Sequence, residues 1–302
     1  MLKQDVFIVG AARTAVGSFL GMYVSTPAVQ LGATAIKAAM ERASIKPADV
    51  GEVFMGNVLT GGEGQAPARQ ACIFSGIPHS APCTTVGKVC GSGAQAIILG
   101  ARTIALGEND LVVAGGMENM SMAPYALPQG RSGYRMGQGV VTDLMVHDGL
   151  WDPYGNQHMG MFAELCAEKY GFTRALQDEF AIESYKRALA AIDGGRFTAE
   201  IVPVILKDKK KGDTELKIDE EPRKFNEAKM RELKAAEIGT AARSRRLVTA
   251  ACFVVRSCRR SNMPRRHGRL ASAGQGHRCE PTGARHDRQS CAAGGAEGRQ
   301  AG

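Results

Sequence analysis

Short apolar runs alternate with longer helical stretches through the first 120 residues, and this alternation restricts the fold more than any other feature. Strands that alternate with helices of about 10 to 16 residues are typical of a mainly parallel sheet covered on both faces. We therefore predict an α/β fold. The strands are expected at 6–9, 53–58, 82–89 and 111–114, and the helices at 28–43, 65–75 and 94–106.

A cysteine, Cys90, lies between the third predicted strand and the helix that follows, in the segment VGKVCGSGA. Open α/β sheets place their chemistry at this carboxyl end of the strands. The start of a helix favours a thiolate over a thiol. The small residues at 91–93 let a substrate carbonyl approach and leave backbone N–H groups free to face an oxyanion. We interpret Cys90 as a nucleophile, the alternative being an ordinary buried cysteine.

Four sequence blocks together carry a family resemblance over about residues 1–235. They lie at 9–14 with Gly17, at 86–94, at 115–121 with 123–125, and at 148–152 leading to 158–160. In this order and spacing they resemble the thiolases, and more closely those of the acetyl-CoA C-acetyltransferase type. The resemblance implies a thiolase-like fold: a βαβαβ parallel-type sheet domain at 1–120 and an inserted loop domain at 121–240.

The resemblance also implies a two-step acyl transfer. Cys90 would take an acetyl group from acetyl-CoA as a thioester, and its own backbone N–H would contribute to the oxyanion hole. The carbanion of a second acetyl-CoA would then attack that thioester to give acetoacetyl-CoA, or the reverse. Covalent catalysis of this kind splits one difficult step into two easier ones. Coenzyme A thioesters are the substrates, and no cofactor or metal is needed.

The expected coenzyme A contacts lie in the loop domain. By resemblance, His158 and Met159 line the pantetheine channel, Leu150 is an apolar contact, and Arg223 lies near the nucleotide end. A guanidinium suits phosphate or adenine because it is planar and always charged. The alternatives are a core methionine and a solvated arginine. The segment 125–141 aligns with the loop through which relatives assemble as homo-oligomers, although it also reads as a flexible surface loop.

The composition changes abruptly near residue 235. Residues 241–302 contain 13 arginines, no lysine and three acidic residues, and no Val, Ile, Leu, Met or aromatic residue follows Leu270. Such a segment buries too little apolar surface to offset chain entropy, so we predict a disordered tail. Our hypothesis is that a change of reading frame replaced the family's second half. A tail that binds nucleic acid or acidic membrane is the rival, but no aromatic residues are interleaved for base stacking.

The family's second half normally supplies a His in a Gly-His-Pro setting, an Asn, and a Cys in a Cys-x-Gly setting, and the 302 residues contain neither motif. Three functions stay open. The first is a thiolase by family that is inactive as this chain alone. The second is an inactive fragment that binds coenzyme A or associates with subunits. The third is a condensing enzyme like the β-ketoacyl synthases.

The cysteine usage indicates the compartment. Eight cysteines without framework spacing favour a reducing compartment over a disulfide scaffold. The first residues do not follow the pattern of a signal peptide, in which a charged segment precedes an apolar one. No uninterrupted apolar run reaches the roughly 18 residues that a transmembrane helix needs. We therefore expect a cytoplasmic protein with no membrane and no nucleic-acid partner.

Overall fold

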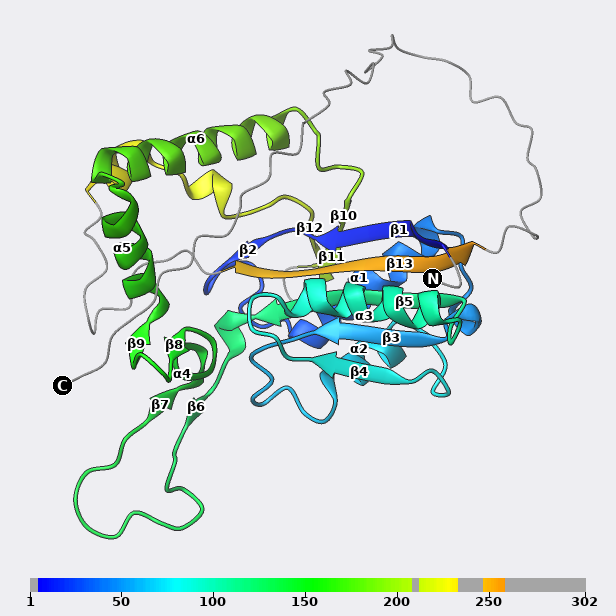
Figure 1. Ribbon diagram of the computed structural model, residues 1–302, viewed down its shortest axis with the longest axis horizontal. Coiled ribbons are helices and arrows are strands. Elements are labelled where there is room, and N and C mark those ends of the chain that lie inside the picture. The colour runs from blue at the N-terminus through cyan, green and yellow to red at the C-terminus, as the bar shows by residue number, and fades with distance from the viewer. Residues whose placement is uncertain (1–4, 208–211, 233–246, 259–302) are drawn as a thin grey trace, which may run out of the picture. The chain divides into compact units, whose positions relative to one another are not determined.

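The computed structural model describes residues 5–207, 212–232 and 247–258. Its centre is a seven-stranded sheet of order β10-β1-β13-β5-β3-β4, with β2 paired to β13 (Figure 1). The strands are β1 Asp5–Thr14, β2 Gly17–Ser18, β3 Glu52–Gly56, β4 Cys83–Val86, β5 Leu111–Asn119, β10 Ile201–Val202 and β13 Leu247–Cys258. The helices that pack on it are α1 Ala28–Arg42, α2 Pro67–Phe74 and α3 Ser92–Leu106.

The predicted parallel arrangement is confirmed around β3, which pairs in parallel with both β4 and β5. β1 and β10 are also parallel. The sheet as a whole is mixed, because β13 runs antiparallel to β1, β5 and β2.

The prediction of a disordered tail from residue 241 is wrong for 247–258. This segment forms β13, which lies in the middle of the sheet between β1 and β5 (orange in Figure 1). The charge of the whole tail hid the local run AACFVV, a short apolar stretch of the kind that forms buried strands. Cys252, Val254 and Val255 are buried within the sheet. The rest of the predicted tail lies outside the described residues.

Alternate residues of each central strand supply the two faces of the sheet, as the two-residue period of a strand requires. In β3, Val53 and Met55 join the apolar cluster under α1 and α2, whereas Phe54 joins the cluster under α3. In β5, Val113 joins the cluster under α1 and α2, and Val112 joins the cluster under α3. The sheet is therefore covered by helices on both faces.

The segment 121–232 consists of short hairpins and helices. The apolar spacing of 174–193 predicts one helix, which is confirmed as α6. The apolar runs 201–206 and 215–218 predict a hairpin, which is confirmed for β11 and β12, while 201–202 form β10 and pair with β1. The 3-10 turns are η1 Pro47–Asp49, η2 Met120–Met122 and η3 Pro222–Lys224. The remaining elements are β6 Tyr125–Ala126, β7 Thr142–Asp143, α4 Leu144–Gly149, β8 Trp151–Asp152, β9 Gln157–His158, α5 Met159–Tyr170, α6 Arg174–Asp193, β11 Val204–Leu206, β12 Thr214–Leu216 and α7 Glu227–Arg231.

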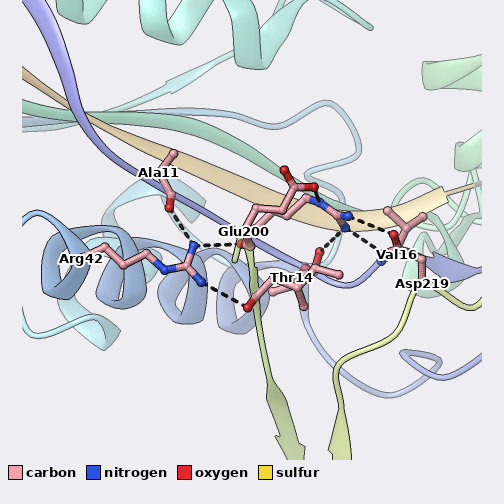
Figure 2. A network of polar contacts seen from close by, with 8 residues as sticks. Ala11, Thr14, Val16, Arg42, Glu200 and Asp219 are labelled. Carbon is pink, nitrogen blue, oxygen red and sulfur yellow. Dashed lines mark hydrogen bonds and ion pairs between the residues drawn. The ribbon is translucent and has the colours of Figure 1, made fainter. Parts of the chain in front are cut away.

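Polar contacts join this segment to the end of β1 (Figure 2). Arg13 donates from Nη1 and Nη2 to the two carboxylate oxygens of the buried Asp219, at 2.7 and 2.9 Å, and from Nε to Glu200 at 2.7 Å. The backbone N–H of Val16 donates to the same Asp219 at 2.7 Å. Arg42 of α1 donates to the backbone carbonyls of residues 11, 200 and 201. We call the pairing of Arg13 with Asp219 and Glu200 the Arg13 clamp.

Helix α3 is apolar on more than the face that packs on the sheet. The window 89–106 is long and apolar enough to cross a membrane by length and composition, but α3 packs on β3 and β5. Ile98 and Leu106 are exposed on it, as are Phe7 and Ile8 on β1.

Candidate active site

Cys90 lies between the end of β4 and the start of α3, as predicted. Its thiol is free and exposed, so the alternative of an ordinary buried cysteine is wrong. The residue before it, Val89, has a positive φ of 46°. A β-branched residue in this left-handed region is a true outlier, and such strain concentrates at functional sites. The sharp turn thus presents the thiol at the carboxyl edge of the sheet.

The turn holds itself in place with short local hydrogen bonds. The backbone N–H groups of Gly91 and Ser92 donate to the carbonyls of Lys88 and Val89, each at 3.0 Å. The Ser92 hydroxyl accepts from the Lys88 N–H at 2.8 Å and donates to the Val89 carbonyl at 2.6 Å. The prediction of free amides at 91–93 is therefore wrong for Gly91 and Ser92, because closing the turn uses them.

Glycines on β3 and β5 let the first turn of α3 approach these strands. A Cβ on Gly56, the last residue of β3, would lie 2.4 Å from the backbone N of Gly93. A Cβ on Gly116 of β5 would lie 3.3 Å from Gly93 Cα. Only residues without a side chain permit this approach. Backbone packing against β3 and β5 therefore sets the position of the helix that follows Cys90.

A carboxylate network occupies the same edge. Glu118, near the end of β5, accepts hydrogen bonds from the backbone N–H groups of Val58 and Leu59 at 2.9 and 3.0 Å, and from the Asn57 side chain at 3.2 Å. The Asn57 backbone N–H donates to the Val86 carbonyl at 3.2 Å. Glu118 thus holds the loop after β3, and that loop is bonded to the end of the strand that leads to Cys90.

A second carboxyl group, Glu63, lies close enough to Glu118 to feel its charge. Burial, with the neighbouring charge of Glu118, raises the pKa of Glu63 to about 7. Burial also raises the pKa of Glu118 above its ordinary value. The hydrogen bonds that Glu118 accepts lower its pKa, but by less than burial raises it. Glu63 Oε2 is buried without a hydrogen-bond partner among the described residues, which makes its ionised form costly. Sequence reasoning assigned no role to this pair, since their contact depends on the fold.

The structure brings together three of the predicted coenzyme A contacts. Strands β8 and β9 pair Trp151 with His158, and the Met159 N–H donates to the Leu150 carbonyl at 2.9 Å. His158 caps α5 by accepting from the Gly160 N–H at Nδ1, at 3.0 Å. Its Nε2 is buried with no hydrogen-bond partner in the part of the chain that the structure describes. Met159 is 42% exposed.

The contacts of Arg223 are with other residues than these three. It stands in η3, and its guanidinium donates to Asp193 at the end of α6 at 3.2 Å. The side chain remains half exposed. The neighbouring Glu221 is buried and accepts from the Ser18 hydroxyl. The structure therefore places Arg223 on the segment that anchors the loop after β1.

Comparison with known proteins identifies the family. The family described as "Thiolase, N-terminal domain" matches residues 6–251, beyond the position near 235 where we expected the resemblance to end. An acetyl-CoA acetyltransferase of Cupriavidus necator is 53% identical over 216 residues, which are 72% of this chain and 55% of the relative. Relatives with the same name from Pseudomonas aeruginosa and Arabidopsis thaliana are 50% and 51% identical over 73% and 76% of this chain.

The matched stretch contains Cys90, the Glu63 and Glu118 pair, and the group of Leu150, His158 and Met159. The chain spans little more than half of these three relatives, 55%, 56% and 58% of their lengths. Because the family match covers most of this chain, we conclude that it belongs to the thiolase family.

Proposed function

We propose that this chain carries the acyl-accepting half of an acetyl-CoA acetyltransferase. The Cys90 thiolate attacks the carbonyl carbon of acetyl-CoA. The bond to the coenzyme A sulfur breaks, the acetyl group stays on Cys90, and the released thiolate takes up a proton. The observation that carries the proposal is an exposed cysteine in a strained turn before α3, inside a stretch about half identical to acetyl-CoA acetyltransferases.

The group of Leu150, His158 and Met159 supports the substrate assignment. A buried ring nitrogen without a partner, His158 Nε2, is a polar group available to a ligand. We assign it to the pantetheine arm of coenzyme A, with Met159 and Leu150 as apolar neighbours. Arg223 is the proposed contact for the nucleotide end, which requires it to exchange its ion pair with Asp193 for the ligand.

Condensation needs a base to remove a proton from the second acetyl-CoA. The family resemblance implies that this base is the Cys of the Cys-x-Gly setting and that the His of the Gly-His-Pro setting activates the nucleophile, both from the family's second half. We therefore expect acylation of Cys90 to be separable from condensation in this chain. Covalent chemistry at a thiol needs less help from a base than chemistry at a hydroxyl, because a thiol ionises more readily.

Mass spectrometry of the full chain incubated with acetyl-CoA tests the proposal. Trypsin places Cys90 in the peptide 89–102, well separated from the other exposed cysteine of the described residues, Cys166. We expect one acetyl group on peptide 89–102, absent in Cys90→Ser and retained in Cys166→Ser. Binding of coenzyme A without acetylation would favour the binding fragment instead. Acylation from an acyl carrier protein but not from acetyl-CoA would favour the synthase-like reading.

We also propose that the chain associates with other subunits through the β6–β7 loop. This loop exposes several apolar side chains, and exposed apolar clusters mark association surfaces. We expect Met136→Ser and Val140→Ser together to lower the oligomeric mass measured by light scattering, and Val24→Ser, at an exposed site on another loop, to leave it unchanged. An unchanged mass in the loop variant would refute this. The exposed side chains are Tyr125, Leu127, Met136, Val140 and Val141.

Five cysteines are free thiols: Cys72, Cys83, Cys90, Cys166 and Cys252. We infer from this a reducing compartment, such as the cytoplasm.

A further inference from the structure

A second cysteine pair lies away from the nucleophile. Cys72 is fully buried in α2, and Cys83 is the half-buried first residue of β4. Helix α2 packs on β4, and Cys83 packs against the apolar cluster that contains Cys72. Both thiols are free, the Cys83 thiol donates to the Ala81 carbonyl at 3.3 Å, and each thiol shifts the pKa of the other. The packing of α2 on β4 has therefore placed two thiols, eleven positions apart in the chain, at one apolar cluster.

The surroundings make the two thiols unequal. A hydrogen bond from Cys72, with the nearby charge of Arg69, lowers the pKa of Cys83 below its ordinary value. The same contact, with burial, raises the pKa of Cys72. Arg69 is held beside the pair by donating to the His79 carbonyl at 3.0 Å. Oxidants attack an accessible thiolate, and a protected neighbouring thiol resolves the product, so this arrangement suits stepwise oxidation.

We propose that Cys72 and Cys83 form an oxidative modification site, which closes a reversible disulfide between α2 and β4 in response to a peroxide. The Cys83 thiolate attacks one peroxide oxygen, the O–O bond breaks, and water leaves with one added proton. Cys72 then loses its proton and attacks the sulfur of the resulting sulfenic acid, which releases a second water. Two thiols and one hydrogen peroxide thus become one disulfide and two waters.

The cross-link would join α2 to the strand that leads to the nucleophile. β4 runs from Cys83 to Val86, and the turn to Cys90 follows at once. The site is nevertheless chemically separate from Cys90, whose exposed thiol has no partner cysteine among the described residues and would oxidise on its own.

Peptide mapping of the full chain after treatment with hydrogen peroxide tests the proposal. Trypsin leaves both cysteines in one peptide, 70–88, because no Lys or Arg lies between Arg69 and Lys88. After oxidation and denaturing alkylation, we expect this peptide to be unlabelled and lighter by two hydrogens. Further cleavage after Phe74 should leave its two pieces joined until dithiothreitol separates them. Two alkyl labels on the peptide, or a sulfinic Cys83 beside a labelled Cys72, would overturn the proposal.

Three comparisons show whether the native fold is responsible. Cys90→Ser should leave formation of the disulfide unchanged. Arg69→Gln should slow it several-fold at neutral pH, because fewer Cys83 thiols are ionised. The wild-type chain in concentrated urea should lose this selectivity and give mixed disulfides. If the denatured chain forms the 72–83 disulfide as fast as the folded chain, proximity in sequence explains it and the proposal fails.

Discussion

The sheet region and the segment 121–232 differ in what holds them together. Helix α1 buries ten of its 15 residues, whereas α5 buries none and α6 buries only Ile182. The second segment is joined to the sheet region by the pairing of β10 with β1, by Val204 in the main apolar cluster, and by polar contacts at the Arg13 clamp and at Ser18 with Glu221. The first region thus has an apolar core under its helices, whereas the helices α5 and α6 of the second bury almost nothing.

This difference has a consequence for the site. The nucleophile Cys90 lies in the sheet region. The group of Leu150, His158 and Met159 lies in the segment 121–232, whose helices bury few residues. Elements with few buried apolar contacts open at low free-energy cost. We therefore expect the coenzyme A group to be more easily perturbed than the turn at Cys90.

The largest expected effect comes from breaking the Arg13 clamp. Arg13→Met leaves Asp219 buried without its cation and should lower the free energy of unfolding by about 3 kcal/mol. Arg187→Met removes an exposed pair with Glu183 and should cost at most about 0.5 kcal/mol. Urea titration followed by circular dichroism measures both. Equal losses in the two variants would show that the clamp does not join the regions.

The next effect tests the close approach of α3. Gly56→Ala places a Cβ 2.4 Å from the backbone of Gly93, so the helix must shift. We expect a loss of about 2 kcal/mol and a changed rate of Cys90 alkylation by iodoacetamide. Gly87→Ala, whose Cβ meets nothing within 4 Å, is the matched control and should stay within about 0.5 kcal/mol. A harmless Gly56→Ala would mean that backbone contact does not set the position of the turn.

A smaller effect concerns pH. The pKa of Glu63 is raised from its ordinary value of 4.5 to about 7 in the folded chain. Its contribution to stability is therefore full below about pH 4.5 and is lost as the pH rises to about 7. Glu63 is partly solvated, so we expect a change of only about 1 kcal/mol.

Urea titrations at pH 5 and pH 8 on Glu63→Gln measure this effect, since the variant lacks the titration. Its stability should fall less between the two pH values than that of the wild type. The exposed Glu183→Gln serves as the control and should behave as the wild type does. A pH dependence in Glu63→Gln as steep as in the wild type would exclude Glu63 as its source.

An effect of similar size separates capping from binding at His158. His158→Ala removes the cap of α5 and should cost about 1 kcal/mol. His158→Asn can restore a side-chain acceptor for the cap but has no Nε2, so it should recover stability without recovering coenzyme A affinity. Calorimetric titration with coenzyme A measures the affinity. Full affinity in His158→Asn would remove Nε2 from the proposed site.

Local patterns predicted much of the sheet region and part of the site. The helix at 174–193 and the helix that begins beside Cys90 follow from apolar spacing and bounding glycines. The pairing of β4 with β3, and the exposure of the thiol at its carboxyl end, follow from the βαβ alternation. These features could be predicted because each depends on residues close together in the chain. The family resemblance added the roles of Leu150, His158 and Met159, which the residues alone do not carry.

Long-range contacts decided what local patterns could not. The sequence by itself determined the α/β class, the strand–cysteine–helix turn and the thiolase membership. Only the tertiary structure placed 247–258 between β1 and β5, paired Glu63 with Glu118, and brought Cys72 to Cys83. The physical reason is that burial and charge interactions depend on which distant segments meet. That meeting is set by the packing of the whole sheet, which no local window of sequence contains.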